Sequence, residues 1–168
     1  MRKGKNPSLP VTGVTWFEAH AYCAWLSEVS GRPFRLPTEA EWEASARGNG
    51  EGIYPWGSEW DSNRANTIEA RVLAQSPVGA FAAAGGRGPF GGEDQAGNVF
   101  EWTNSLYGFA YPYQADARES AMSGGARSLR GGSANHEGCV ARCAYRFEAS
   151  PDLFANDMGF RMASSVDA

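Results

Sequence analysis

The sequence predicts a single α+β domain with two helices, a small antiparallel sheet and long irregular loops. Two segments near the N-terminus carry helix start signals, and four short strand signatures follow in the second half of the chain. Helices that precede the strands favour segregated elements over alternating ones. The 168 residues and 18.0 kDa are about the size of one domain, so residues 1–168 are assigned to one unit.

The first helix is predicted to begin after Thr15, because Thr15 and Glu18 have the spacing at which each side chain satisfies the other's backbone N–H. Apolar residues then recur three or four positions apart, which predicts one buried stripe. The stripe consists of Ala19, Tyr22, Cys23, Leu26 and Val29. Gly31 is expected to end the helix as its C-cap.

The second helix is predicted to run from Thr38 to about Arg47. Thr38 and Glu41 repeat the capping pattern of the first helix, and Pro37 favours an extended residue just before the cap. The Gly-Asn-Gly sequence at 48–50 ends the pattern. This helix is short and has a well-marked start.

The rest of the chain is predicted to be loops and short strands. Residues 54–92 contain Tyr-Pro-Trp-Gly, Ser-Pro and Gly-Pro turn signals and no sustained periodicity. Strand signatures follow at 98–103, 128–131, 143–146 and 159–162. Aromatic residues make up 12 % of the chain, which is the composition of a folded, loop-rich protein and not of a disordered one.

Charge and hydropathy argue against several classes of partner. Fifteen Lys and Arg against nineteen Asp and Glu give a net charge of −4, so neither nucleic acid nor an anionic membrane is an expected partner. No apolar run approaches the length of a membrane span, and the N-terminus has no apolar signal core. The default location is therefore cytoplasmic, and display on a cell or phage surface would need a further segment.

The cysteines do not predict a disulfide framework. Cys23, Cys139 and Cys143 cannot all pair with one another, and the chain has no Cys-x-x-Cys pair of the kind found in zinc ribbons. A reducing compartment is the plainer interpretation.

Six strings are more specific than any periodicity. They are PVTGVTW at 10–16, RLPTEAEWE at 35–43, YPWG at 54–57, GNVFEWT at 97–103, RGGS at 130–133 and GFR at 159–161. In this order they resemble the formylglycine-generating-enzyme (sulfatase-modifying factor) family, from about residue 10 to 162. The resemblance implies a C-type-lectin-like fold. The opening strand and helix that usually precede the first string are missing, which suggests an excerpt of a longer chain or a trimmed domain.

The resemblance also locates the catalytic thiols of the true formylglycine-generating enzymes, three and eight residues after the Ser of RGGS. These positions are His136 and Ala141 here, and neither can replace a thiolate that binds copper. No copper is therefore expected. A displaced redox pair of Cys139 and Cys143 is the weaker alternative, since most cysteines are small apolar fillers.

A structural calcium ion is implied by the same resemblance. The string from Asp94 to Glu101 matches a family calcium loop, in which Asp94 and Glu101 would supply side-chain oxygens and Gly97 and Val99 would supply carbonyl oxygens. Calcium accepts such a mixture of oxygen ligands. A second family calcium site, beginning at Ala65-Asn66, is not expected, because no downstream Asp aligns. The alternative is that Asp94 starts a turn and Glu101 is a solvated strand residue.

Residues 134–157, called the tract below, resemble the variable region of diversity-generating-retroelement variable proteins, with 130–161 as the candidate variable region. The flanking Arg and Gly residues keep the family frame. Between them stand residues that adenine-directed mutagenesis of Asn codons can produce, and Glu137, which a Lys codon could yield. With Glu137, the predicted ligand-binding residues are Ala134, His136, Cys139, Val140, Tyr145, Phe147, Ala149, Ser150, Leu153 and Ala155.

The sequence therefore predicts a non-catalytic protein that binds a protein or other macromolecular ligand through the surface of residues 134–155. A rigid frame with exchangeable side chains lets binding change while the fold persists. Two alternatives stay open. One is a copper-dependent formylglycine-generating oxidase, and the other is a drifted, inactive scaffold that has lost its old active site.

Overall fold

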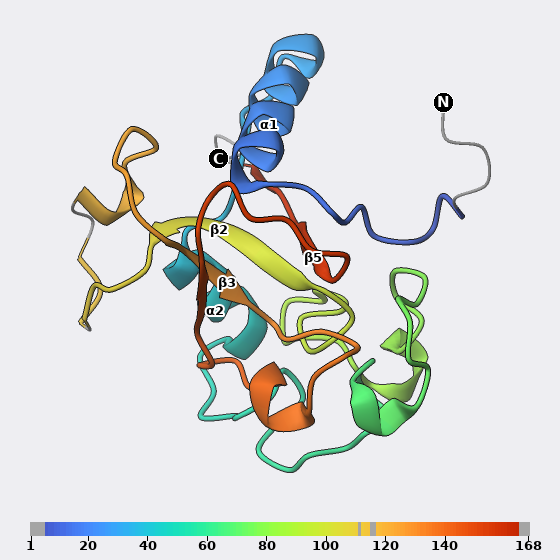
Figure 1. The fold of residues 1–168 in the computed structure, drawn as a ribbon. Coiled ribbons are helices and arrows are strands. Elements are labelled where there is room, and N and C mark those ends of the chain that lie inside the picture. Colours follow the sequence, from blue (N-terminus) through green and yellow to red (C-terminus); the bar gives the residue numbers. More distant parts are fainter. Residues whose placement is uncertain (1–5, 111, 115–116, 165–168) are drawn as a thin grey trace.

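The computed structural model of the chain describes residues 6–110, 112–114 and 117–164. Helix α1 (Trp16–Ser30) projects from one end of the molecule, and helix α2 (Glu39–Arg47) packs against the central sheet (Figure 1). Loops with short 3-10 turns make up much of the remainder. These turns are η1 (Ile68–Ala70), η2 (Ala82–Ala84), η3 (Ala117–Glu119) and η4 (Gly138–Ala141).

Both helices begin at the predicted capping boxes. The Thr15 hydroxyl accepts a hydrogen bond from the Glu18 N–H at 3.1 Å, and the Glu18 carboxylate accepts one from the Thr15 N–H at 2.8 Å. Thr38 and Glu41 make the same reciprocal pair at 3.1 and 2.9 Å. Gly31 then ends α1 in the left-handed conformation, with φ of 66°. The predicted starts of both helices are therefore confirmed.

The buried stripe of α1 is shorter than its periodicity predicts. Trp16, Ala19 and Cys23 are buried, but Tyr22 is 43 % exposed and Val29 is 59 % exposed. The prediction that the stripe continues to Val29 is wrong, because α1 projects away from the sheet after its first turns (Figure 1). Apolar spacing identifies the apolar side of a helix. How many turns of that side are buried depends on which other elements pack against the helix.

The central sheet has four strands in the order β4-β3-β2-β5. β2 (Phe100–Leu106) pairs antiparallel with β3 (Arg127–Arg130), which pairs antiparallel with β4 (Phe147–Ala149). β5 (Met158–Phe160) pairs with β2 in parallel, so the prediction of an antiparallel sheet is wrong at this strand. After β4 the chain crosses to the far side of β2 and re-enters the sheet beside it. A second, antiparallel pair joins β1 (Phe34–Arg35) to β6 (Ala163–Ser164).

One predicted strand is absent. The signatures at 98–103, 128–131 and 159–162 correspond to β2, β3 and β5 within a few residues, but residues 143–146 form a turn and lead into β4. The carbonyl oxygens of Cys143 and Tyr145 accept hydrogen bonds from the Arg130 guanidinium. These backbone groups are thus satisfied by a side chain and not by a neighbouring strand.

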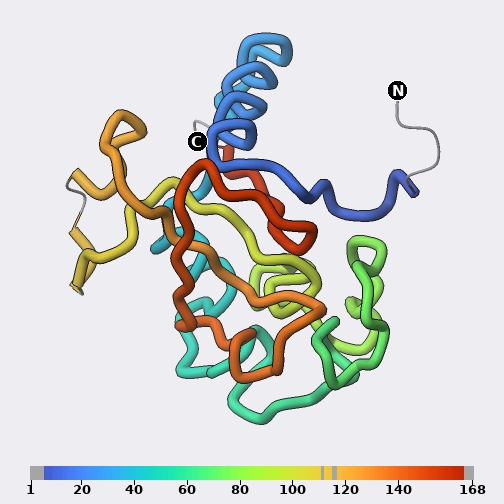
Figure 2. Tube along the Cα trace, viewed as in Figure 1, coloured from blue at the N-terminus to red at the C-terminus, as the bar shows by residue number. Residues whose placement is uncertain are grey.

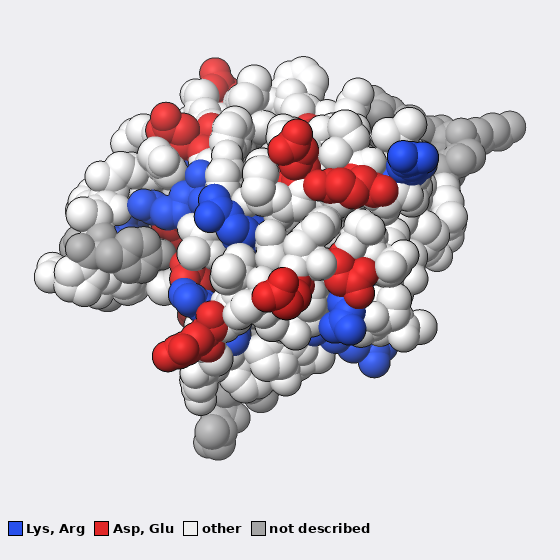
Figure 3. Space-filling view, turned by 90° about the horizontal axis from the view of Figure 1, so that it is seen from below, with Lys and Arg blue, Asp and Glu red and all other residues white. Residues whose placement is uncertain are grey.

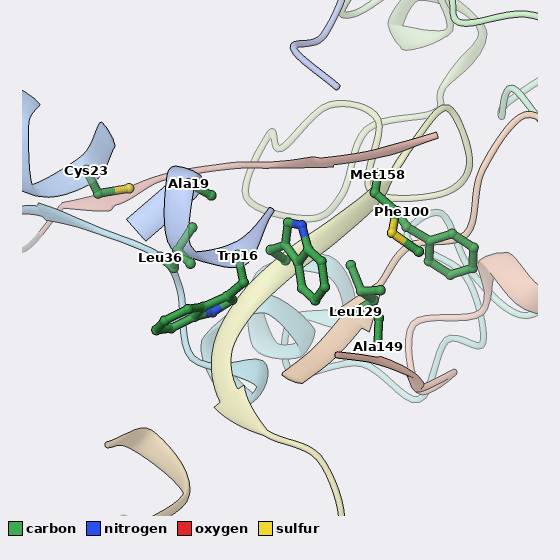
Figure 4. Packing of buried hydrophobic residues seen from close by; sticks show 9 residues of the cluster. Trp16, Ala19, Cys23, Leu36, Phe100, Leu129, Ala149 and Met158 are labelled. Atoms are coloured by element: carbon green, nitrogen blue, oxygen red, sulfur yellow. The ribbon is translucent and has the colours of Figure 1, made fainter. Parts of the chain in front are cut away.

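The main core surrounds β2. Figure 4 shows Trp16, Ala19, Cys23 and Leu36 near one end of this strand, and Phe100, Leu129, Ala149 and Met158 near the other. Trp102 of β2 completes the set. Two small satellite clusters lie apart from it: Trp42 with Ala46 and Cys143, and Ala65 with Ala96 and Ala141.

The irregular half of the molecule is held by hydrogen bonds between loops. The Val78 N–H donates to the Ser8 carbonyl at 2.8 Å, so the N-terminal segment runs beside the loop around residue 78 (Figure 2). The buried Asn66 amide donates to the Ala74 carbonyl and to the Ser76 hydroxyl. In the described part of the chain, no helix has the length and apolar character needed to cross a membrane.

Candidate functional site

Arg130 is the central residue of the frame that carries the tract. Its side chain is fully buried and donates to the carbonyl oxygens of Cys143 at 2.9 Å and Tyr145 at 2.6 Å. Its guanidinium also pairs with Glu39 and Glu43 of α2. A buried cation is tolerated only with such partners, so Arg130 determines the path of the tract between η4 and β4.

Arg146 connects the second half of the tract to the same helix. Its guanidinium donates two hydrogen bonds to the Glu39 carboxylate, both 2.7 Å long. The guanidinium also lies 4.8 Å from the centre of the Tyr107 ring. Glu39 therefore receives two arginines, one from β3 and one from the tract, and joins them to α2.

Two glycines complete the frame where β3 ends. Gly131 and Gly132 have φ of 93° and 74°, a region that other residues rarely adopt. A Cβ on Gly132 would lie 3.2 Å from the Ala141 backbone, and one on Gly131 would lie 3.2 Å from the Trp42 ring. The close approach explains why these positions are glycine and agrees with a structural role for them. We use "frame" below for Arg130, Gly131, Gly132, Arg146 and their α2 partners.

The tract crosses one side of the molecule, from η4 to the loop beside the start of α1 (Figure 1). That loop is held where the Trp16 N–H donates to the Pro151 carbonyl at 3.0 Å. Nine of the predicted binding residues are exposed or half-buried. They are His136, Glu137, Cys139, Val140, Tyr145, Phe147, Ser150, Leu153 and Ala155.

The buried ring of Phe100 brings His136 and Phe147 together, although they are separated along the tract. The Phe147 ring stacks on Phe100 at 5.2 Å between centroids, and the His136 ring meets Phe100 edge-on at 5.1 Å. Phe147 remains 38 % exposed. These two side chains can therefore contact one ligand, which the sequence spacing alone does not show.

Two predicted contact residues are wrong. Ala134 is 3 % exposed and Ala149 is 6 % exposed, so neither side chain reaches a ligand. Ala149 belongs to the main core, where it packs with Leu129. Val140 and Ala155 also pack partly against this core, so each offers only part of its surface.

A hydrogen-bonded group holds the start of the tract. The buried Ser133 hydroxyl lies 2.7 Å from His136 Nδ1 and donates to the Asp157 carboxylate at 2.9 Å. Serine is central here, whereas a serine nucleophile needs histidine between the serine and the acid. The group therefore connects the two ends of the tract and does not form a hydrolytic triad.

Sequence reasoning missed Phe154. Its side chain is 65 % exposed and lies next to Leu153, which is 47 % exposed. Phenylalanine is one of the residues that adenine-directed mutagenesis of an Asn codon can produce. The same criterion that selected the other tract residues could therefore have identified Phe154. Two adjacent exposed apolar side chains make this loop the more apolar end of the surface.

Acidic and basic side chains are interspersed on the face seen in Figure 3. Basic side chains gather in the left half of this view, and acidic side chains lie around them and to the right.

A family model for the sulfatase-modifying factor enzyme 1-like domain matches residues 1–166. The chain belongs to the sulfatase-modifying factor family. It is 38 % identical over 171 residues to the inactive C-alpha-formylglycine-generating enzyme 2 of Mus musculus, covering 94 % of this chain and 50 % of that protein. It is 34 % identical over 181 residues to the formylglycine-generating enzyme of Streptomyces coelicolor, covering 96 % and 54 %. The chain thus spans about half the length of these relatives.

The fold of this family member matches a solved variable protein. Treponema denticola variable protein 1 superposes with a TM-score of 0.79 at 22 % identity, covering 96 % of this chain and 73 % of that one. The predicted α+β, C-type-lectin-like fold of the formylglycine-generating type is therefore confirmed. The sulfatase-modifying factor family includes both active enzymes and relatives named inactive, so membership alone does not assign catalysis.

The thiol positions of the family lie in different surroundings in this chain. His136 is half-buried in the tract, whereas Ala141 is fully buried with Ala65 and Ala96 and has no donor atom for a metal. Cys139 is exposed, but Cys143 packs against Trp42, and burial raises the pKa of its thiol to about 11. A thiol with this pKa stays protonated at neutral pH, which disfavours a displaced redox pair.

The family calcium loop does not present its oxygens freely here. The Glu101 carboxylate accepts hydrogen bonds from the Trp42 indole at 2.6 Å and from the Arg161 guanidinium, whose Nη2 lies 2.6 Å from Oε1. The Gly97 carbonyl accepts from the Val99 N–H at 2.9 Å. These residues do not fit a calcium ion in this arrangement, since an ion that needs six to eight oxygens would have to displace Arg161. Calcium binding stays a prediction from the resemblance.

Proposed function

We propose that the protein is a non-catalytic ligand-binding protein, a variable protein of a diversity-generating retroelement. Its ligand is a protein or another macromolecule, bound through the exposed residues of the tract. The observation that carries the proposal is the division between a buried frame, centred on Arg130, and the exposed side chains of the tract that it holds. A frame of this kind allows the side chains to vary without loss of the fold.

The composition of the exposed tract residues supports binding. Phe147 and Leu153 offer apolar contact area, and Tyr145 adds a half-buried aromatic ring. Glu137 and Ser150 are exposed polar groups that can adapt to different partners. Aromatic anchors among adaptable polar residues are typical of protein-binding surfaces.

The positions of the family's thiols favour this proposal over the oxidase. A copper site of two thiolates needs soft donors at both positions, and His136 with Ala141 supplies none. Assays of the purified protein with copper and a cysteine-containing sulfatase-type peptide are expected to give no formylglycine. Formation of formylglycine would show that the oxidase alternative is correct.

The first test is the DNA that flanks the gene. A diversified binder requires a near-copy of the segment that encodes residues 130–161, with mismatches at template adenines, close to a reverse-transcriptase gene. The expected mismatches fall on codons for exposed tract residues and spare those for Arg130, Gly131 and Gly132. If the flanking DNA lacks such a copy, the drifted, inactive scaffold becomes the better interpretation.

A binding test follows once a partner is identified. Tyr145→Ala, Phe147→Ala and His136→Ala are each expected to weaken the complex by about fivefold or more, because interface anchors typically contribute over ~1 kcal/mol. Glu28→Ala is the control, since Glu28 is an exposed residue of α1 outside the tract. Affinities that stay within twofold for all three variants would contradict the assignment of the surface.

A further inference from the structure

A pocket of about 420 Å³ lies beside the tract and is lined by none of the residues predicted to bind the ligand. Its lining combines two tryptophans with three charged side chains, namely Trp56, Trp60, Glu59, Asp61 and Arg64. A Cβ on Gly138 would clash with the Trp60 ring, so this tryptophan packs directly against η4 of the tract. A volume of this size is typical of sites that bind small chemical groups, commonly about 300–1,000 Å³.

The two tryptophans form an aromatic corner that is held in place by its surroundings. Their ring centroids are 5.8 Å apart, and the ring planes are inclined by 42°. The buried Tyr54 ring stacks on Trp56 at 5.5 Å, and the Trp56 indole N–H donates to the Glu59 carbonyl at 3.0 Å. Both tryptophans pack against the Ala65 cluster but stay half-buried, so each keeps part of its surface open. An open aromatic face attracts cations, and tryptophan does so most strongly.

The charges at the border of this pocket do not cancel. The Arg64 guanidinium donates to the Asp61 carboxylate at 3.0 Å, so these two charges balance each other. Glu59 is exposed and forms no ion pair with any residue that the structure describes. The border therefore carries an excess of negative charge beside two tryptophan rings, and both features favour a cation over a neutral group or an anion.

We propose that this pocket receives an arginine side chain of the protein that the tract binds. A guanidinium is planar, so it can lie on an indole face while its N–H groups donate to the Glu59 carboxylate. A lysine ammonium has the same charge but lacks the planar shape. The inference rests on the proposed function, because it names a chemical group of the same ligand.

The place of the pocket in the sequence gives it a role that the tract cannot have. Its lining residues lie between 56 and 64, outside the candidate variable region at 130–161. The contact with arginine therefore stays the same when the side chains of the tract change. A constant anchor next to exchangeable contacts lets different ligands bind in a similar orientation.

The test is an NMR titration of the full chain with N-acetylarginine methylamide, followed through the tryptophan indole N–H signals. N-acetylcitrulline methylamide is the matched probe, because it keeps the shape of arginine and loses the charge. The arginine probe is expected to bind about threefold or more tightly than the citrulline probe, as a partly exposed cation–π contact requires. N-acetyllysine methylamide is expected to bind more weakly than the arginine probe.

Two variants locate the effect in the pocket. Glu59→Gln removes the unpaired carboxylate at an exposed position, so it is expected to reduce the advantage of arginine over citrulline about twofold. Trp56→Leu removes one of the two rings and is expected to abolish that advantage. Glu28→Gln is the control, because it removes an exposed negative charge from α1, outside the pocket.

Equal affinities for the arginine and citrulline probes would overturn the proposal. An effect of Glu28→Gln as large as that of Glu59→Gln would also overturn it, since the attraction would then come from the net charge of the protein. Lysine that binds as tightly as arginine would contradict the assignment to a planar guanidinium. The probes need no ligand of the tract, so their failure leaves the proposed function unaffected, whereas flanking DNA without a template copy would contradict the proposed function alone.

Discussion

Arg130 and Phe147 belong to neighbouring strands of one sheet, yet their environments are opposite. Arg130 is fully buried and contacts two carbonyl oxygens and two glutamates, whereas Phe147 is 38 % exposed and rests on one ring. In this protein a buried arginine with hydrogen-bond partners determines the path of the backbone. The exposed apolar side chain is not needed for that path and is available to contact a ligand. In most proteins the charged residue would be the exposed one.

The largest expected effect is at Arg130. Arg130→Met keeps much of the side-chain volume but leaves Glu39 and Glu43 short of a cation and two carbonyl oxygens without a donor. We expect the free energy of unfolding, measured by urea denaturation, to fall by about 3–5 kcal/mol. The control is Arg142→Met in the exposed part of the tract, for which no comparable loss is expected. A loss below about 1 kcal/mol for Arg130→Met would show that the frame is not what supports the tract.

The next comparison uses two apolar side chains. Leu129 is fully buried, so Leu129→Ala is expected to cost about 2–5 kcal/mol of unfolding free energy. Phe147→Ala removes a half-exposed ring and its stacking on Phe100, and about 1 kcal/mol is expected. Both values come from the same denaturation assay. Equal losses would place Phe147 in the core and weaken its assignment to the binding surface.

The reaction rates of two cysteines distinguish an exposed from a buried position within the tract. Cys139 is exposed, whereas burial raises the pKa values of Cys23 and of Cys143, the latter to about 11. With iodoacetamide at pH 8, Cys139 is expected to react at least ~100-fold faster than Cys143, because the thiolate is the nucleophile. Peptide mass spectrometry at timed intervals measures both rates. Comparable rates would revive the Cys139–Cys143 redox pair.

The smallest expected effect is the pH dependence at Asp94. Its folded-state pKa is raised by burial, so ionisation of Asp94 costs stability at pH 7 and costs nothing well below its ordinary pKa of about 4. Asp94→Asn is therefore expected to increase the unfolding free energy at pH 7 by about 1 kcal/mol or less. The gain should shrink as the pH falls from 7 towards 4. A gain that does not change with pH would have another cause.

Local features of this protein were readable from the sequence. Both helix starts depend on a Thr and a Glu three residues apart, and such contacts need no other part of the chain. The family strings likewise predicted the fold, and they showed that His136 and Ala141 stand where the enzymes have cysteines. Nine of the eleven residues predicted to bind a ligand are exposed or half-buried, as surface positions of a fixed frame would be, and their role in binding stays a prediction.

Contacts between distant segments were decided only by the tertiary structure. Periodicity could not show that α1 projects beyond the sheet, that β5 joins β2 in parallel, or that Ala134 and Ala149 are buried. The pairing of Glu101 with Arg161, 60 residues away, likewise depends on β5 lying beside β2. Burial and charge balance depend on which segments meet in space, and the spacing of residues along one segment does not contain that information.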